Sequence, residues 1–488
     1  MIIKKDKDTI KNYFEDNSGV KHAYADFVAI AENDEEVGAF LEEMSKTKTP
    51  VTVAGALTGN TASALAFGGA VLSLEKLNNI GEIAVINKNE AEITVGAGAR
   101  LSDIKAKAAA AGWFYPPDPT EKNATIGGNI STNASGGRGF KFGVTRDYVK
   151  EITIVFTDGS KARFARGEIF ADNSGRISFQ TDKGVKNITL PKYKLPRIKN
   201  AAGYYNYPNA DLIDVFIGSD GTLGVIIEAK LKLIMHFKEV FGGIVFFETL
   251  DKAYDFVKIV KEKTNAMSLE FFDRNALGVI KEDYPVIPQN AAAGIMFEQD
   301  VYGNDFDVLM EKWVSLIEQS GIDSKNVWFG ENEAEQEKFR TFRHRIPERV
   351  NERVRKNGVP KVGTDFAVPE GKLAEMVDFC EKEFEKSGLF YLTFGHIGEN
   401  HLHANIIAAN EAEYQKARNL YSGIAQKAVE LGGTVSAEHG IGKLKHIFLA
   451  SMLGEAGFKE MAKFKKSLDK STILGVDNIF PKKYLENN

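Results

Sequence analysis

Residues 116–149 read PPDPTEKNATIGGNISTNASGGRGFKFGVTRDYV and place six glycines among many serine, threonine and asparagine residues. Glycine allows a backbone to approach a ligand closely and to adopt positive φ, while amides and hydroxyls donate hydrogen bonds to phosphate oxygens. This composition suits a loop that holds a diphosphate. For a single cluster, the alternative that the glycines serve only tight turns is the commoner case.

Two further clusters flank this stretch in the chain: VAGALTGNTASALAFGG at 53–69 and GSDGTLG at 218–224. Three such loops in one region are hard to explain as turns alone, so we expect a nucleotide cofactor. The dinucleotide fingerprint of the doubly wound fold is absent, because the nearest stretch, GAGAR at 96–100, lacks its third glycine. A GxxxxGK[ST] phosphate loop is absent too.

Strands and helices alternate around these loops. Apolar spacing predicts a helix at 36–46, a buried strand from Val51 and a helix at 101–112, and Asp158-Gly159 between two strand-like runs predicts a hairpin. Beyond about residue 238 the sequence pattern changes to strand and helix stretches with fewer glycine clusters. We therefore expect an α+β chain with domains at 1–237 and 238–445, followed by a helical segment, 446–488, that packs back on the first domain.

Charge and cysteine content narrow the class of protein. The 62 basic and 67 acidic side chains give a net charge of −5 and are mixed along the chain, which argues against nucleic-acid binding. The single cysteine, Cys380, excludes an internal disulfide and a cysteine-ligated iron–sulfur cluster, and fits a reducing compartment. The charged N-terminus does not resemble a signal peptide, and 18 consecutive apolar residues occur nowhere. We expect a cytoplasmic protein and leave peripheral membrane attachment and a homodimer open.

Five of the eight histidines fall in FGHIGENHLHANII and SAEHGIGKLKH, between 396 and 446. If the first motif forms a hairpin around Ile397–Asn400, alternation along the strands puts His396, His401 and His403 on one face. A lone strand histidine is usually a packed residue, but three beside a downstream Glu-His pair indicate a divalent metal with open coordination positions.

Basic residues gather in FRTFRHRIPERVNERVRKNGVPK, from Arg340 to Lys361. Most charges on such a helix simply face water. A planar guanidinium is also the group best suited to a bidentate bond with a carboxylate, so one of these arginines is a candidate for substrate binding.

The order of the three glycine clusters and the histidine motifs resembles the FAD-linked oxidases of the vanillyl-alcohol oxidase type, in the branch with D-lactate, D-2-hydroxyglutarate and glycolate dehydrogenases. The resemblance covers about residues 25–485, and PPDPTEKNATIGGNISTNASGG is its most specific element. It implies a two-subdomain FAD-binding domain and an antiparallel-sheet substrate (cap) domain with flanking helices.

The resemblance also implies which residues hold FAD. The first loop is expected to wrap the diphosphate, the second to line the diphosphate and isoalloxazine, and the third, with the end of the second, to hold the ribose and adenine. By position these residues are Gly55, Thr58, Gly59, Asn60, Pro117, Asp118, Thr120, Thr125, Gly127, Gly128, Asn129, Thr132, Asn133, Gly137, Phe142, Gly143, Asp220, Gly221, Gly224 and Ile226. Leu57 stands where the family usually has glycine, and Asp220 replaces its usual glutamate.

On the substrate side, the resemblance implies that His396, His403 and Glu438 bind a divalent metal (zinc, manganese or iron). His439 is expected to accept the substrate proton, and Asn405 to contact the substrate. Arg343 is expected to clamp its carboxylate, assisted by Lys361. His401 stands at a common asparagine position and is interpreted as a hydrogen-bonding substitute rather than a ligand. Pro347 stands where the 2-hydroxyglutarate enzymes carry threonine, which favours a substrate of lactate size.

The expected function is therefore metal-assisted oxidation of a small D-2-hydroxy acid, D-lactate first, by hydride transfer to flavin N5. Electrons would pass to a non-nicotinamide acceptor: a quinone, a cytochrome or an electron-transfer flavoprotein. Glycolate and D-2-hydroxyglutarate are the alternative substrates. The alternative from another class is a flavin-free metal-binding protein, in which the glycine loops are turns.

Overall fold

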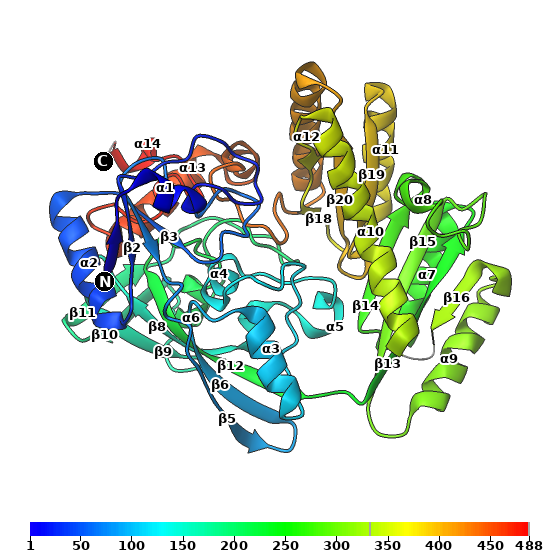
Figure 1. The fold of residues 1–488 in the computed structure, drawn as a ribbon, viewed down its shortest axis with the longest axis horizontal. Coiled ribbons are helices and arrows are strands. Elements are labelled where there is room, and N and C mark those ends of the chain that lie inside the picture. The colour runs from blue at the N-terminus through cyan, green and yellow to red at the C-terminus, as the bar shows by residue number, and fades with distance from the viewer. Residues whose placement is uncertain (331–332, 487–488) are drawn as a thin grey trace. The chain divides into compact units, whose positions relative to one another are not determined.

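A computed structural model describes residues 1–330 and 333–486 of the chain (Figure 1). It divides into two compact units. The first unit comprises Met1–Ser135, Val144–Met235 and Ser436–Asn488, and the second comprises Gly136–Gly143 and His236–Val435.

The first unit begins with a small sheet whose strand order is β1-β2-β4-β3 (Ile2–Lys4, Phe27–Ile30, Ala70–Ser73 and Val51–Ala54). Strands β2, β4 and β3 are parallel. Helix α2 (Asp34–Thr47) starts at Asn33, whose side chain accepts a hydrogen bond from the Glu36 amide, 3.0 Å away. It buries Val37, Leu41 and Met44 in the core beside this sheet, as helical spacing predicts.

The first unit also contains an antiparallel sheet in the order β5-β6-β12-β8-β9, with β7 beside β12, and a separate β10-β11 hairpin. The Asp158-Gly159 turn joins β8 to β9, as the sequence predicts. The strands are β5 (Ile80–Asn87), β6 (Glu90–Gly96), β7 (Trp113–Phe114), β8 (Val149–Val155), β9 (Lys161–Ala165), β10 (Arg176–Thr181), β11 (Gly184–Thr189) and β12 (Val225–Met235). The helices are α1 (Lys7–Ile10), α3 (Leu101–Ala110), α4 (Ile126–Thr132), α6 (Leu212–Phe216), α13 (His446–Leu468) and α14 (Lys483–Glu486).

The second unit is built on an antiparallel sheet in the order β16-β13-β15-β14-β19-β20-β17, with β18 beside β20 (Figure 1). All nine residues of β15 are buried. The strands are β13 (Glu239–Phe247), β14 (Ser268–Asp273), β15 (Ala293–Val301), β16 (Val327–Gly330), β17 (Val362–Gly363), β18 (Phe366–Ala367), β19 (Phe390–Gly395) and β20 (His401–Ile407). The flanking helices are α7 (Leu250–Lys263), α8 (Arg274–Ile280), α9 (Phe306–Gln319), α10 (Glu333–Asn357), α11 (Leu373–Ser387) and α12 (Glu411–Glu430).

Helix α10 is fixed to this sheet by a row of buried apolar residues. Phe342, Ile346 and Val350 lie in one core cluster with Phe272 of β14 and Leu392 of β19. Their spacing of four residues gives the helix one apolar face. Because this apolar face packs on the sheet, the position and rotation of α10 are fixed, and so are the directions in which its arginine side chains extend.

A short segment of the glycine-rich stretch belongs to the second unit. We call Gly136–Gly143, which includes helix α5 (Gly139–Phe142), the strap. Arg138 forms two bonds of 3.2 Å with Glu298, and Lys141 bonds Asp300 at 2.6 and 2.7 Å. Both acids lie on β15, so partly buried ion pairs hold the strap on the sheet of the second unit.

The boundaries of the two units lie only partly where the sequence predicts domain boundaries. The second unit begins at His236, close to the expected 238, and residues 446–486 group with the first unit. The strap and residues 436–445 group differently from the expectation. A boundary predicted from sequence patterns divides the chain into consecutive segments. The strap and residues 436–445 instead join their units through ion pairs and hydrogen bonds with segments that are distant in the sequence.

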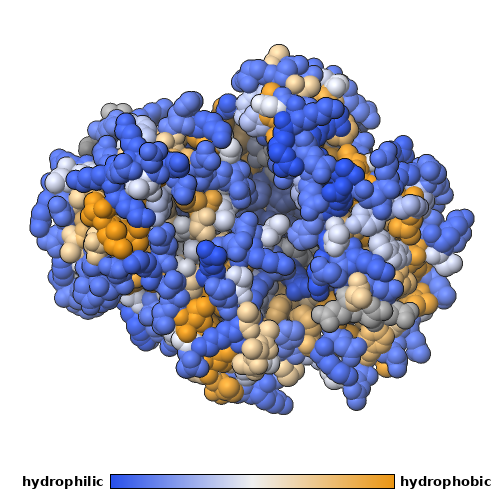
Figure 2. Space-filling model, in the orientation of Figure 1, coloured by the Kyte–Doolittle hydropathy of each residue, from blue (hydrophilic) through white to orange (hydrophobic). Residues whose placement is uncertain are grey.

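The surface agrees with the charged composition. Hydrophilic residues cover most of the face shown in Figure 2, and its apolar patches are small and separate. Among the described residues, none of the helices has both the length and the apolar character needed to cross a membrane.

Candidate functional site

The three glycine loops meet at helix α4 of the first unit. An added Cβ on Gly55 would lie 2.2 Å from Thr125 Oγ1, so the first loop packs directly on the start of α4. The third loop is bonded to its end, because the Gly218 amide donates to Ile130 O at 2.9 Å and the Asp220 amide to Ser131 O at 2.8 Å. The fold thus brings together three clusters that are far apart in the sequence.

Two positions that depart from the resembled family keep a glycine-like backbone. Leu57 and Asp220 both have φ of 57°, in the left-handed region that disfavours most side chains. The Asp220 carboxylate accepts a hydrogen bond of 3.0 Å from the Gly442 amide, and Asn478 Nδ2 donates to Asp220 O at 2.9 Å. Burial raises the pKa of Asp220. These bonds hold the third loop in its turn.

The loops fit a nucleotide tail. The Asn129 side chain is 4% exposed, and its Nδ2 has no hydrogen-bond partner among the described residues. A buried amide donor without a partner is costly, so it suits a ligand oxygen. An added Cβ on Gly59 would meet no heavy atom within 4 Å, and Gly59, Asn60 and Gly128 are exposed, as a cradle for a ligand requires.

Other residues expected to hold the cofactor have structural explanations of their own. An added Cβ would lie 2.7 Å from Ala97 Cβ at Gly127 and 2.5 Å from Ile154 Cγ2 at Gly224, so packing alone requires glycine there. Ile226 is buried, and Asp118 pairs with Lys105 at 2.5 Å. In the first unit, Thr58, Pro117, Thr120, Thr125, Thr132, Asn133 and Gly221 lie in or beside the three loops, whereas Gly137, Phe142 and Gly143 lie in the strap of the second unit.

The Glu438-His439 pair lies on a loop bonded to the first glycine loop. Thr61 Oγ1 donates to His439 O at 3.4 Å, and the Lys443 amide donates to Thr61 O at 2.9 Å. Ser135 Oγ and Lys199 Nζ both donate to Glu438 Oε1 at 2.6 Å. Within the first unit, the predicted proton acceptor is therefore fixed beside the predicted flavin loop.

In the second unit, strands β19 and β20 form the predicted hairpin around Ile397–Asn400. The ring centroids of His396 and His401 are 5.4 Å apart, those of His396 and His403 5.8 Å, and those of His401 and His403 4.4 Å. Each imidazole offers a nitrogen within 4.8 Å of a nitrogen on the others. The prediction that these three histidines share one face is confirmed.

Each histidine is held by an oxygen atom. Glu270 Oε1 lies 2.5 Å from His396 Nδ1, Asp365 Oδ1 lies 3.1 Å from His401 Nε2, and Thr364 O lies 3.1 Å from His403 Nδ1. An oxygen acceptor at one ring nitrogen leaves the other nitrogen to act as a ligand. Neutral imidazoles oriented in this way fit a divalent cation. The structure describes Glu438 and His439 with the first unit, so their part in that site stays a prediction.

Arg343 is distinct from the other arginines of α10. Its Nε donates to Glu270 Oε2 at 3.0 Å, and its side chain is 17% exposed. By contrast, Arg345 and Arg349 pair with Asp283 near the surface. Although burial raises the pKa of Glu270, the charge of Arg343 and the hydrogen bonds from Arg343 and His396 hold it well below its usual range.

Asn405 and Lys361 meet next to the histidines. Lys361 Nζ donates to Asn405 Oδ1 at 2.8 Å, and Asn405 follows His401 and His403 at alternate positions of β20. Alternate strand residues point to the same face. The second unit thus gathers His396, His401, His403, Asn405, Lys361 and, through Glu270, Arg343.

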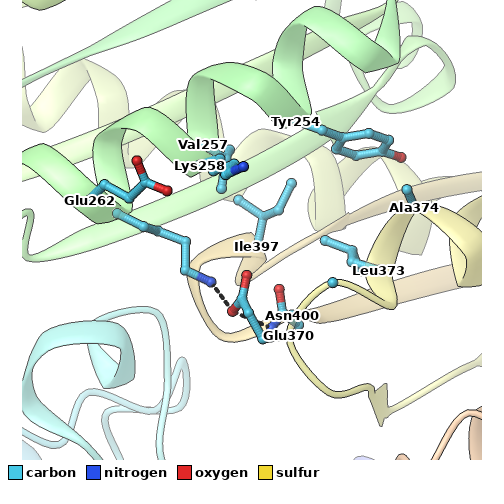
Figure 3. A pocket seen from close by; sticks show the side chains of 11 residues that line it. Tyr254, Val257, Lys258, Glu262, Glu370, Leu373, Ala374, Ile397 and Asn400 are labelled. Atoms are coloured by element: carbon cyan, nitrogen blue, oxygen red, sulfur yellow. Dashed lines mark hydrogen bonds and ion pairs between the residues drawn. The ribbon is translucent and has the colours of Figure 1, made fainter.

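A cavity of about 480 Å³ lies beside the turn that joins β19 to β20 (Figure 3). It is lined by α7 residues such as Tyr254 and Val257, by Leu373, and by Ile397 and Asn400 of the turn itself. Glu370 accepts bonds from Lys261 and Asn400 at its edge. Among its described lining residues, none was predicted to bind substrate, so we do not assign it to the reaction.

Sequence reasoning missed three acidic or basic residues that hold the site. Glu270, Asp365 and Lys199 sit in stretches without a histidine or glycine motif, and each contacts a predicted site residue far away in the sequence. The only signal was a charged residue within an apolar run, as in SLEFFD at 268–273. A buried charge of this kind needs a partner, but the sequence does not say which.

Known protein families match both parts of the chain. Residues 25–164 match the family model "FAD binding domain", and residues 240–477 match "FAD linked oxidases, C-terminal domain". The chain is 30% identical to glycolate oxidase subunit GlcD of Bacillus subtilis over 94% of this chain and 89% of that one. It is 29% identical to D-lactate dehydrogenase of Anaerostipes hadrus over 92% and 88%, and 26% identical to D-2-hydroxyglutarate dehydrogenase of Xanthomonas citri over 93% and 89%.

Among solved structures, alkyldihydroxyacetonephosphate synthase matches with a TM-score of 0.65 at 16% identity, covering 97% of this chain and 82% of that one. At this identity the likeness concerns the fold alone. Together with the family models, it confirms the predicted two-domain fold of FAD-linked oxidases of the vanillyl-alcohol oxidase type.

Proposed function

Because this chain belongs to the family of FAD-linked oxidases, we propose that it is an FAD-dependent dehydrogenase of a small D-2-hydroxy acid, with D-lactate as first choice. The observation that carries the proposal is the pairing of two kinds of site in one chain. Three glycine loops converge on α4, and three oriented imidazoles lie in a unit that also carries Arg343.

The chain's own residues have distinct roles in this proposal. Arg343 and Lys361 bind the substrate carboxylate, and Asn405, bonded to Lys361, orients the substrate. His439 accepts the proton of the substrate hydroxyl. FAD, when bound by the glycine loops, supplies the acceptor for the α-hydrogen as hydride. A divalent ion held by His396, His403 and Glu438 would lower the pKa of the hydroxyl.

The choice of D-lactate rests on α10. Pro347 is four residues beyond Arg343, on the same helix face, and offers no side-chain donor for a second carboxylate. This favours a substrate with one carboxylate. Glycolate and D-2-hydroxyglutarate remain the alternatives, and the relatives named above carry all three activities in their names.

The natural electron acceptor is proposed to be a quinone, a cytochrome or an electron-transfer flavoprotein, since the residues fit no nicotinamide motif. A homodimer is compatible with the chain.

A panel of acids tests the proposal. Purified protein is mixed without oxygen with D-lactate, L-lactate, glycolate and D-2-hydroxyglutarate, and bleaching of the flavin absorbance is followed. We expect fastest bleaching by D-lactate and the least by L-lactate. A colourless protein that binds metal and bleaches with none of the acids would instead be the flavin-free metal-binding protein.

A further inference from the structure

Glu270 touches two residues that the sequence assigns to different tasks. It lies on β14 with its side chain 1% exposed. Oε1 is 2.5 Å from Nδ1 of His396, at the end of β19, and Oε2 accepts from Nε of Arg343, on α10. One buried carboxylate therefore joins a predicted metal ligand to the predicted clamp for the substrate carboxylate.

Both contacts restrict orientation. The carboxylate at Nδ1 sets the tautomer of His396 and fixes the orientation of its ring, whose centroid lies 5.4 Å from that of His401 and 5.8 Å from that of His403. The Nε bond fixes the plane of the Arg343 guanidinium, and α10 itself is fixed by its buried apolar face. A shift of the Glu270 side chain would therefore move both groups.

The strap packs against this pair. An added Cβ on Gly137 would lie 2.7 Å from Glu270 Oε1 and 3.5 Å from His396 Nδ1. The strap has little freedom to retreat, since its Arg138 and Lys141 are bonded to β15. Gly137 was expected to hold FAD from its place in the sequence, but this contact alone requires glycine there.

We propose that Glu270 is a positioning residue that holds His396 and Arg343 in one geometry, and that Gly137 is glycine to make room for that contact. Metal binding and substrate binding are then linked through one carboxylate. This inference rests on the proposed function for the meaning of Arg343, but its metal-binding half can be tested without turnover.

The test compares four holoproteins: the parent, Glu270→Gln, Gly137→Ala and Asp273→Asn. The Asp273 variant is the matched control, because it removes a buried acid of the same strand, β14, whose side chain accepts from the Ala276 and Thr393 amides and not from His396 or Arg343. For each we measure flavin content by absorbance, affinity for Zn²⁺ and Mn²⁺ by competition with a chromophoric chelator, and KM and kcat with the best acid of the panel.

We expect Glu270→Gln to weaken binding of the tighter ion by about 10- to 100-fold and to raise KM more than it lowers kcat. Gly137→Ala should weaken metal binding in the same direction by a smaller factor. Flavin content should stay at the parent value in both variants, and Asp273→Asn should keep the parent's metal affinity and KM. Glu270→Asp, which restores a carboxylate, should recover part of the affinity.

Three results would overturn the inference: parent-like metal affinity and KM in Glu270→Gln, an equal loss of metal in Asp273→Asn, or a parent protein that binds neither ion. Loss of flavin from Gly137→Ala with unchanged metal affinity would overturn the role of Gly137. If instead the parent bleaches with no hydroxy acid, the proposed function fails, and the metal affinities of the four proteins still decide whether Glu270 positions His396.

Discussion

The flavin loops of the first unit depend on backbone conformation, whereas the histidine hairpin of the second unit depends on side-chain contacts. The loops are shaped by backbone: Leu57 and Asp220 keep φ of 57° where a glycine would be unstrained. The hairpin is shaped by side chains, each imidazole being held by an oxygen atom from another segment. A backbone site can therefore accept a changed residue if the turn survives, whereas a side-chain site depends on partners that must all be present.

The largest expected effect is a loss of turnover without a loss of flavin binding, in the variant His439→Ala. His439→Ala should lower kcat by about 10²- to 10⁴-fold, the usual contribution of a positioned proton acceptor. The flavin absorbance spectrum should be unchanged, because the imidazole is not part of the glycine loops. Steady-state kinetics and a visible spectrum of the same sample check this. Normal turnover would remove His439 from the proposed mechanism.

Removal of metal should lower the rate of substrate oxidation without releasing flavin from the glycine loops. Dialysis against a strong chelator is expected to lower D-lactate oxidation at least about tenfold, since a divalent ion stabilises developing charge on oxygen. Adding back Zn²⁺ or Mn²⁺ should restore the rate, and flavin content should not change. A full rate after exhaustive chelation would mean that His396, His403 and Glu438 do not hold a catalytic ion.

A glycine substitution should affect only the backbone site. In Gly55→Ala the new Cβ would lie 2.2 Å from Thr125 Oγ1, so either the first loop or the Thr125 side chain at the start of α4 must shift, and flavin should be lost on dilution. Gly278→Ala, on α8 of the second unit, meets no heavy atom within 4 Å and is the matched control. Flavin retention after gel filtration compares the two. Equal retention would argue against close packing of the first loop on α4.

A pH effect on stability should arise in the second unit from Asp273. Burial raises the pKa of this carboxyl from 3.8 to about 7. The folded chain thus binds the proton more tightly than the unfolded chain, so the favourable contribution is complete below about pH 4 and is lost as pH rises through 7. Melting temperature should fall less between pH 5 and 8 in Asp273→Asn than in the parent. Parallel melting curves would contradict the assignment.

The smallest effect should come from removing strain in the first loop. Leu57→Gly frees a left-handed position and is expected to stabilise the folded first unit by about 1 kcal/mol, offset in part by the greater freedom of glycine in the unfolded chain. Urea unfolding monitored by flavin release measures it. A loss of stability would show that Leu57 packing against the core outweighs the strain.

Sequence patterns predicted most of the fold because its elements are locally encoded. The helix at α2, the hairpin at Asp158-Gly159 and the hairpin that carries the histidines all have short-range signals, and all three form. The two-domain class came from the resemblance and is confirmed by the family models.

The parts that sequence could not predict depend on contacts between distant segments. Glu270 and Asp365 had no motif, since a buried acid is recognised only by its partner in space. Gly137 sits within the most recognisable motif of the chain, yet its nearest neighbours are Glu270 and His396. When a whole glycine-rich motif is assigned to FAD, a glycine within it that contacts other residues, such as Gly137, is overlooked.

The interleaving of the two units sets an order for assembly as the chain is synthesised. The strap leaves the ribosome before β15 exists, so Arg138 and Lys141 must wait for Glu298 and Asp300. The first unit can be completed only after residues 465–473 have been synthesised. The Val51 amide donates to Ile473 O, and Lys465 Nζ donates to Thr222 O. Neither unit can be completed as an independent N-terminal piece, and a ribosome stalled near residue 300 would hold a nascent chain with the first unit unfinished.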